Sequence, residues 1–223
     1  MTLRYADRAE AGRLLAQALG RHRDHLCVIY ALPRGGVPVG FEIARALHAP
    51  LDLMLVRKLG VPYQPELAMG AVADGDPPVV VLNDDIVAVV ASDKRVIAEA
   101  TARESAEIER RRKLYLGGRQ ALSAAGRIAI VVDDGLATGA TARAALRALK
   151  RQKPSRLILA VPVAPAETVA VLKPEADEIV CLQVVEDFIA VGAYYRNFRQ
   201  VEDEEVARLL AAAAPEAAPA KGG

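Results

Sequence analysis

Short apolar runs rich in β-branched residues recur along the chain, and amphipathic segments lie between them. The runs with the length of buried strands are residues 26–32, 51–56, 128–132, 156–163 and 178–184. Apolar residues at helical spacing mark the segments 7–19, 39–47, 142–151, 167–172 and 201–210. Strands that alternate with helices predict an α/β fold, in which a mostly parallel twisted sheet is flanked by helices. Pro162 and Pro165 are expected to close the fourth strand.

The segment between the second and third of these strands has a different pattern. Two short apolar runs, residues 69–73 and 79–82, flank a stretch of Asp, Gly and Pro, which predicts a β-ribbon or a mobile flap. Residues 92–116 predict a long helix, in which Glu107 and Arg111 are spaced to pair across one turn. Gly117 and Gly118 should end that helix. Residues 211–223 predict a disordered tail, so we expect a single domain over residues 1–210.

Composition narrows the class of protein. The 223 residues are 52% hydrophobic, which suffices for one sizeable core. A formal net charge of +1 provides no strong field for nucleic acid or a membrane surface. Because neither a signal-peptide pattern nor an apolar run of membrane-spanning length occurs, we expect a cytoplasmic protein. Cys27 and Cys181 lie in apolar runs, which favours buried thiols over a disulfide framework.

The most informative motif follows the strand at residues 128–132. Residues 133–141 read D-D-G-L-A-T-G-A-T, and a helix should begin at residue 142. Backbone N–H groups of such a loop, together with the helix N-terminus, can surround a phosphate group. Gly135 and Gly139 allow sharp turns and a close approach of the ligand, while Thr138 and Thr141 add hydroxyl donors.

The acids at the start of this motif suit a sugar. Asp133 and Asp134 can accept hydrogen bonds from a ribose diol, or support Mg²⁺ with its waters. The motif therefore predicts a phosphosugar site, and the alternative is a strand-to-helix turn with two solvated acids. It lacks the lysine of a Walker A sequence, which argues against the usual P-loop.

A second strand–loop–helix unit precedes this one in the chain. Arg34, Gly35 and Gly36 follow the strand at residues 26–32, where glycine amides can face an anion and arginine can add a charge-assisted bond. A tight turn with a solvated arginine is the alternative. Arg57 and Lys58 stand at the expected end of the strand at residues 51–56 and suit a pyrophosphate. Since open α/β sheets bind ligands at the carboxyl ends of their strands, we expect these loops and cations to share one site.

The acid pair and the Thr138-Gly139-Ala140-Thr141 turn resemble the phosphoribosyl pyrophosphate loop of type I phosphoribosyltransferases, and the resemblance extends over residues 26–184. It implies that Asp133 and Asp134 hold the ribose hydroxyls, meet Mg²⁺ through water or ribose, and act in catalysis with Lys58. It also implies that the phosphosugar lies against Gly135, Ala137, Thr138, Gly139, Ala140 and Thr141. The same resemblance assigns the pyrophosphate to the loop of Arg34, Gly35 and Gly36, which often contains a cis peptide, and to the cations Arg57 and Lys58.

Members of this family also have a loop that closes over the active site and a hood that contributes to the nucleobase site. The resemblance places the flap at about residues 60–92 and the hood at about residues 185–200, joined by the N-terminal part. Phe188, Tyr194 and Tyr195 could stack on a planar base. An aromatic lid over the core is the alternative.

The reaction that this resemblance implies is Mg²⁺-dependent transfer of a 5-phosphoribosyl group from phosphoribosyl pyrophosphate to a nitrogenous base, with release of pyrophosphate. The expected acceptor is of the purine type. Ala137 stands where many 6-oxopurine enzymes of the family carry an acid, and adenine-type members commonly have alanine, which argues against a hypoxanthine-type general base. A homo-oligomer is compatible with the sequence. Two alternatives stay open: a regulatory protein that binds phosphoribosyl pyrophosphate without transfer, and a flavodoxin-like receiver with Asp133 as phosphoacceptor.

Overall fold

The computed structural model describes residues 4–61, 64–75, 77–83, 87–88 and 94–213. Five parallel strands form its central sheet, in the order β2 (Leu51–Leu53), β1 (Cys27–Ala31), β6 (Ile128–Val132), β7 (Arg156–Pro165) and β8 (Glu178–Val185). The mostly parallel α/β sheet predicted from the sequence is thus confirmed.

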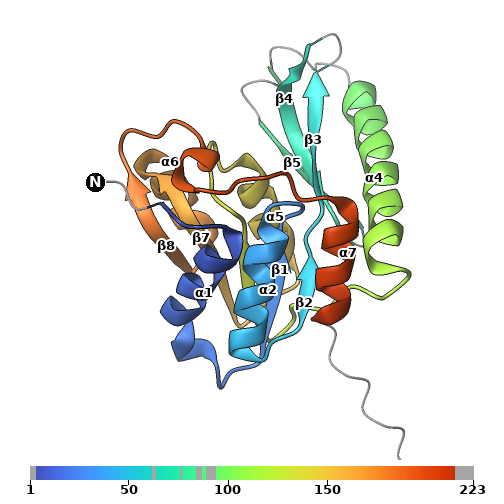
Figure 1. Ribbon diagram of the computed structural model, residues 1–223. Helices are drawn as coiled ribbons and strands as arrows, with labels where there is room; N and C mark the ends of the chain where they lie inside the picture. The colour runs from blue at the N-terminus through green and yellow to red at the C-terminus, as the bar shows by residue number, and fades with distance from the viewer. Residues whose placement is uncertain (1–3, 62–63, 76, 84–86, 89–93, 214–223) are drawn as a thin grey trace, which may run out of the picture.

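Helices cover both faces of this sheet (Figure 1). One face packs on α1 (Arg8–Ala18) and α2 (Gly36–Leu47), and the other packs on α5 (Ala140–Arg151) and α6 (Ala166–Leu172). Successive strand residues point to opposite faces, so Ile130 joins the first core cluster and Val131 the second. Both clusters need apolar side chains, which is why the central strands read as continuous apolar runs. Short 3₁₀ turns follow α1 and α6, at η1 (Gly20–His22) and η2 (Lys173–Glu175).

A second, antiparallel sheet holds β3 (Val56–Val61), β4 (Gln64–Ala73) and β5 (Val79–Leu82). It stands beside the upper end of the central sheet in Figure 1, with α4 (Lys94–Leu116) along it. The β-ribbon expected from the two short apolar runs is present. Residues 62–63, 76, 84–86 and 89–93, which belong to the expected flap and the start of the expected helix, lie outside the described residues.

The structure corrects the strand predicted at residues 51–56. That run splits into β2 of the central sheet and the start of β3 in the second sheet, and Met54 and Leu55 between them are buried. An apolar run continues across the junction because both sheets need buried residues there. Arg57 and Lys58 consequently lie inside β3, opposite Val72 and Ala71 of β4, and not at the end of a central strand.

Of the two prolines expected to close the fourth strand, Pro165 ends it and Pro162 does not. β7 continues to Pro165, and its register with β8 passes from Val161–Cys181 to Val163–Gln183 without pairing Pro162. The neighbour on the other side, β6, ends opposite Ala160, so the missing N–H of proline interrupts no bond there. The carbonyl of Pro162 accepts a 2.8 Å hydrogen bond from the Tyr5 hydroxyl.

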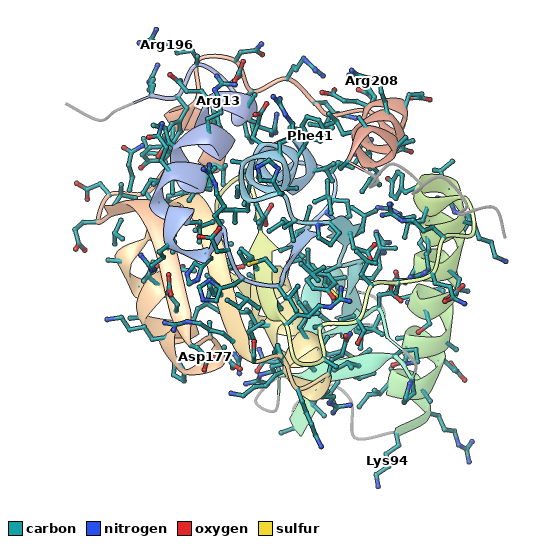
Figure 2. All side chains as sticks on the ribbon, turned by 90° about the horizontal axis from the view of Figure 1, so that it is seen from below. Arg13, Phe41, Lys94, Asp177, Arg196 and Arg208 are labelled. Carbon is teal, nitrogen blue, oxygen red and sulfur yellow. The ribbon has the colours of Figure 1, made fainter. Side chains whose placement is uncertain are left out.

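The N-terminal segment joins the region after β8. Tyr5 forms a bridge with Tyr195, next to the 3₁₀ turn η3 (Val191–Tyr194). The last helix, α7 (Asp203–Ala212), packs on α2 and α4; in Figure 2, α2, which carries Phe41, lies between α1 and α7. The tail expected from residue 211 begins too early, since α7 reaches Ala212, and residues 214–223 lie outside the described part. No helix in the described part is long and apolar enough to span a membrane.

Candidate functional site

The acid pair lies where the central sheet changes its winding direction. β1 and β6 are neighbours, but the chain leaves β1 for α2 on one face and β6 for α5 on the other. Ligand crevices form at such a point, outside the carboxyl ends of the strands. Asp133 and Asp134 directly follow β6, and residues 34–36 lie between β1 and α2. The two loops predicted to share a site are therefore adjacent.

The first loop packs directly on the acid pair. A Cβ atom on Gly35 would lie 2.0 Å from Oδ2 of Asp134, and one on Gly36 would lie 2.6 Å from the carbonyl oxygen of Val132. At Gly36 the neighbours are backbone atoms, so glycine is required there, whereas a side chain at Gly35 would displace the Asp134 carboxylate. The peptide bond between Pro33 and Arg34 is cis, as the resemblance implied. The two loops touch with no side chain of the first loop between them.

Hydrogen bonds hold Asp134 at its backbone and at its carboxylate. Its N–H donates to Oδ1 of Asp133 over 2.9 Å, and its carbonyl oxygen accepts from the Tyr195 hydroxyl over 2.6 Å. Its Oδ2 accepts from Nε of Arg8 over 2.7 Å, and the two side chains of this ion pair are 10% and 14% exposed. An ion pair so sheltered is weakly screened by salt. Both the backbone and the carboxylate of Asp134 therefore have fixed positions.

Burial alters the protonation of the acid pair. It raises the pKa of Asp133 well above its ordinary value, and the neighbouring Asp134 carboxylate raises it further. Burial also raises the pKa of Asp134, while the Arg8 guanidinium opposes that rise. Hydroxyl donors or a cation brought by a ligand would favour the charged form of both acids.

Hydrogen bonds connect the loop after the acid pair to β7 and α6. The Leu136 N–H donates to the carbonyl of Val163 over 2.9 Å. The hydroxyl of Thr168, which is buried, donates to the carbonyl of Ala137 over 2.6 Å. These bonds fix the loop to β7 and α6 while its outer side stays exposed at Ala137.

The same loop opens onto the N-terminus of α5. Gly135 and Gly139 have φ angles of 152° and 69°, which side chains rarely adopt. Gly139 caps α5 without a side-chain hydrogen bond, and Thr138 and Ala140 are exposed while Thr141 is half-buried. The N–H groups of the first helical turn are therefore available to an anion.

The predicted cations differ in how they are engaged. Nη1 of Arg34 lies 3.4 Å from Oδ1 of Asp203, and Nε of Arg57 lies 3.0 Å from Oε2 of Glu104. Lys58 is exposed. An anion that binds Arg34 or Arg57 must therefore compete with a carboxylate, whereas Lys58 already faces solvent.

Asp203 connects three elements beside the first loop. It is the first residue of α7, and besides Arg34 it accepts a 2.7 Å hydrogen bond from the hydroxyl of Tyr115 in α4. Burial, together with the hydrogen bond and charge of Asp203, raises the pKa of Tyr115 to about 12. The hydrogen bond from Tyr115 and the charge of Arg34 lower the pKa of Asp203. Asp203 is therefore charged at neutral pH and holds Arg34 toward α7.

A cavity of about 860 Å³ lies between β3, α4 and the two loops. Its lining includes Pro33 of the first loop, Thr141 at the start of α5 and Lys58 of β3. A second hollow of about 410 Å³ shares Lys58 and Thr141 with the first. Cavities of this size suit small-molecule ligands. Lys58 and Thr141 thus face one space, which Pro33 also lines.

The aromatic residues of the expected hood pack mainly on one another. Tyr194 and Tyr195 are 5% and 4% exposed. Phe188 stacks on Tyr194 with ring centroids 5.8 Å apart, and Phe198 lies 5.1 Å from Tyr195. This packing favours the aromatic lid for Tyr194 and Tyr195. Phe188 is half-buried, and so keeps part of its ring open.

Two residues of the site were not predicted from the sequence. Arg8 binds Asp134 across a separation of 126 residues, and Asp203 binds Arg34 across 169. The sequence held one indication for Arg8: a cation in the first turn of a helix is unfavourable beside the helix dipole, which suggests that it binds an acid elsewhere. Asp203 had none, since acids are favoured in a first turn.

Magnesium fits this donor set as part of a ligand complex. Mg²⁺ prefers oxygen ligands, keeps several waters and is usually bound by one or two carboxylates plus substrate phosphates. Within the described ranges, no group of three or more His, Cys, Asp or Glu side chains could hold a metal ion. Asp133 and Asp134 offer carboxylate oxygens, so an ion carried by a diphosphate could meet them through water or through the ribose.

Comparison with known proteins shows which family model and which relatives this chain matches. A sequence model of the phosphoribosyl transferase domain matches residues 5–198. Two proteins from different strains of Mycobacterium tuberculosis are each 47% identical over 206 residues, or 92% of this chain, and both are named "Putative phosphoribosyl transferase". The chain spans 46% of each, about half the length of these relatives.

Solved structures show the same likeness. The crystal structure of a Thermus thermophilus protein, TT1426, is 42% identical, with a TM-score of 0.83 over 96% of this chain and 100% of its own. A hypothetical protein from Neisseria gonorrhoeae, crystallised with bound ppGpp, is 15% identical, with a TM-score of 0.51 over 95% of this chain and 98% of its own. At that identity the second likeness concerns the fold alone.

Proposed function

Because this chain belongs to the phosphoribosyl transferase domain family, we propose that it transfers a 5-phosphoribosyl group from phosphoribosyl pyrophosphate to a nitrogen of a nucleobase and releases pyrophosphate. The proposed acceptor is of the purine type. Ala137 supports an adenine-type purine over an oxopurine, since the loop has no acid at that position to act as a base toward an oxopurine, and adenine-type members of the family commonly have alanine there.

The contact between the acid pair and the first glycine loop carries the proposal. Phosphoribosyl pyrophosphate has a phosphate at one end, a diol in the middle and a diphosphate at the other end. The open turn at α5 suits the phosphate, the acid pair suits the diol, and residues 34–36 suit the diphosphate. A Cβ on Gly35 would lie 2.0 Å from the Asp134 carboxylate, so the diol and diphosphate positions adjoin, as they do in the ligand.

The chemistry requires little beyond positioning and charge. As the bond to pyrophosphate breaks, positive charge develops on the ribose ring and negative charge on the leaving group. Asp133 and Asp134 would hold the ribose and stabilise the positive charge on its ring. Arg34, Lys58 and the loop amides would neutralise the negative charge on the departing pyrophosphate. Bound Mg²⁺ would supply further neutralisation of the diphosphate.

Pyrophosphate release tests the proposal. The protein is mixed with phosphoribosyl pyrophosphate, Mg²⁺ and each member of a purine and pyrimidine panel, and we expect release that depends on a purine. The double variant Asp133→Asn with Asp134→Asn should abolish it, and Asp24→Asn, at an exposed acid outside the site, should not. Binding without turnover across the whole panel would favour the regulatory alternative instead.

A further inference from the structure

A buried cation holds one carboxylate of the acid pair. Arg8 stands in the first turn of α1, where positive charge opposes the helix dipole, yet its side chain is only 10% exposed. Its Nε donates to Oδ2 of Asp134 over 2.7 Å. Burying a charge is costly unless a partner is at hand, so the position of Arg8 is explained by Asp134 and not by the helix.

Two further contacts fix the Arg8 guanidinium. Nη1 donates to the carbonyl oxygen of Arg199 over 2.8 Å. The guanidinium carbon lies 3.9 Å from the centroid of the Phe198 ring, within cation–π range. Both partners follow η3, in the region that covers the acid pair. The planar fork of arginine makes these contacts together, which a lysine ammonium does not.

Arg8 supplies the positive charge beside the Asp134 carboxylate. Apart from Arg8, its neighbours include the Gly35 backbone and the Asp133 carboxylate, and a second carboxylate repels it. Tyr195 binds the backbone carbonyl of Asp134. Asp133 accepts from the backbone N–H of Asp134 and also shares a side-chain hydrogen bond with its carboxylate. Since Asp133 is itself an acid, Arg8 supplies the charge-assisted bond that sets the orientation of the Asp134 side chain.

We propose that Arg8 is a positioning residue for the phosphosugar site, an inference that rests on the proposed function. Arg8 fixes the Asp134 carboxylate in the orientation in which the acid pair receives the ribose hydroxyls. It acts through Asp134 and not by touching the sugar. Loss of Arg8 lets the carboxylate turn away, which weakens recognition of the hydroxyls and leaves the 5′-phosphate contacts at α5 in place.

Two sugar phosphates separate these contributions in equilibrium titrations. Ribose 5-phosphate and 2-deoxyribose 5-phosphate carry the same phosphate, but only the first offers a 2-hydroxyl to the acid pair. We expect the unaltered protein to bind ribose 5-phosphate on the order of tenfold more tightly, the effect of one hydrogen bond to a charged group.

Arg8→Met should reduce this preference to about twofold or less and change the affinity for 2-deoxyribose 5-phosphate by less than about twofold. Arg8→Lys should give an intermediate preference, since it keeps the charge without the fork. Arg13→Met is the matched control. Arg13, which is labelled in Figure 2, lies on the same helix. Its side chain is 57% exposed, and its Nη1 lies 3.8 Å from Oε1 of Glu42, so this variant should match the unaltered protein.

Full preference in Arg8→Met, or in Arg8→Lys if the methionine variant does not fold, would overturn the positioning role. An equal loss for both ligands would also overturn it, because a purely structural residue affects both alike. If the unaltered protein bound neither sugar phosphate, or bound both equally, the proposed function would fail first and the role of Arg8 with it.

Discussion

Replacing Gly36 by alanine tests how closely the two loops fit. The added Cβ would lie 2.6 Å from the carbonyl oxygen of Val132 and 3.1 Å from Cα of Asp133. Both neighbours are backbone atoms, so no side chain can rotate away. Ordinary contact begins at 3.4 Å, and the loops must therefore separate by roughly 0.8 Å, which moves the acid pair relative to the first loop.

This displacement has two expected effects. Overpacking of this kind lowers the free energy of unfolding by about 1–3 kcal/mol, which for a chain of this size corresponds to a fall in Tm of about 2–12 °C. Misplacing reacting groups by about 1 Å can lower the rate on the order of 100-fold. We expect pyrophosphate release to fall by about that factor in Gly36→Ala.

Calorimetric unfolding and the pyrophosphate-release assay measure these two effects. Gly20→Ala is the control, because a Cβ at Gly20 would meet nothing within 4 Å, and it should change neither quantity. If Gly36→Ala behaved like Gly20→Ala in both assays, the loops would not be in close contact in solution, and the reasoning from a shared site would be wrong.

Three other substitutions have defined outcomes. Asp133→Asn should raise the Tm at pH 7. Burial raises the pKa of Asp133 in the folded protein, so protonated Asp133 stabilises the fold below about pH 4, and this contribution is lost as the pH rises through the folded pKa. Equal Tm values for the variant and the unaltered protein at pH 7 would contradict this. Asp203→Asn should weaken the 3.4 Å contact between Asp203 and Arg34. The inhibition constant of pyrophosphate should fall by up to about fivefold, since an exposed ion pair contributes at most about 1 kcal/mol. An inhibition constant that stays the same or rises in steady-state assays would argue against competition between Asp203 and pyrophosphate for Arg34. Tyr195→Phe removes the 2.6 Å hydrogen bond to the carbonyl of Asp134 and should cost about 1 kcal/mol in urea unfolding; an unchanged midpoint would show that this bond contributes nothing.

Most of the fold could be predicted because its signals are local. The apolar run at residues 128–132 is β6, with the same bounds. Gly117 and Gly118, with φ angles of 55° and 89°, follow the end of α4 as expected. Glu107 and Arg111 pair across one turn at 2.8 Å. Each of these features depends on residues a few positions apart, where spacing determines contact.

The sheet to which a strand belongs was harder to predict from the sequence. The apolar run at residues 51–56 serves both sheets, and hydrophobicity alone does not mark the point between Leu53 and Val56 where the chain passes from one sheet to the other. Arg57 and Lys58 were therefore predicted at the end of a central strand, whereas they lie within β3. Their partners, including Glu104 of α4, depend on tertiary packing.

The candidate site shows the same division. The glycines and acids of the two loops were identified because their chemistry appears within a few residues. The residues that orient them come from distant parts of the chain, as Arg8 does for Asp134 and Asp203 does for Arg34. Burial of Tyr195 likewise depends on Tyr5, whose ring centroid lies 5.5 Å away. Sequence spacing contains no information on such pairs.

Calorimetric titration with phosphoribosyl pyrophosphate and Mg²⁺ tests most directly whether the acid pair and the two glycine loops form one binding site. We expect a single saturable binding event, which added pyrophosphate competes away and which the double variant Asp133→Asn with Asp134→Asn loses. No binding by the unaltered protein, or equal binding by the double variant, would contradict the placement of the ligand.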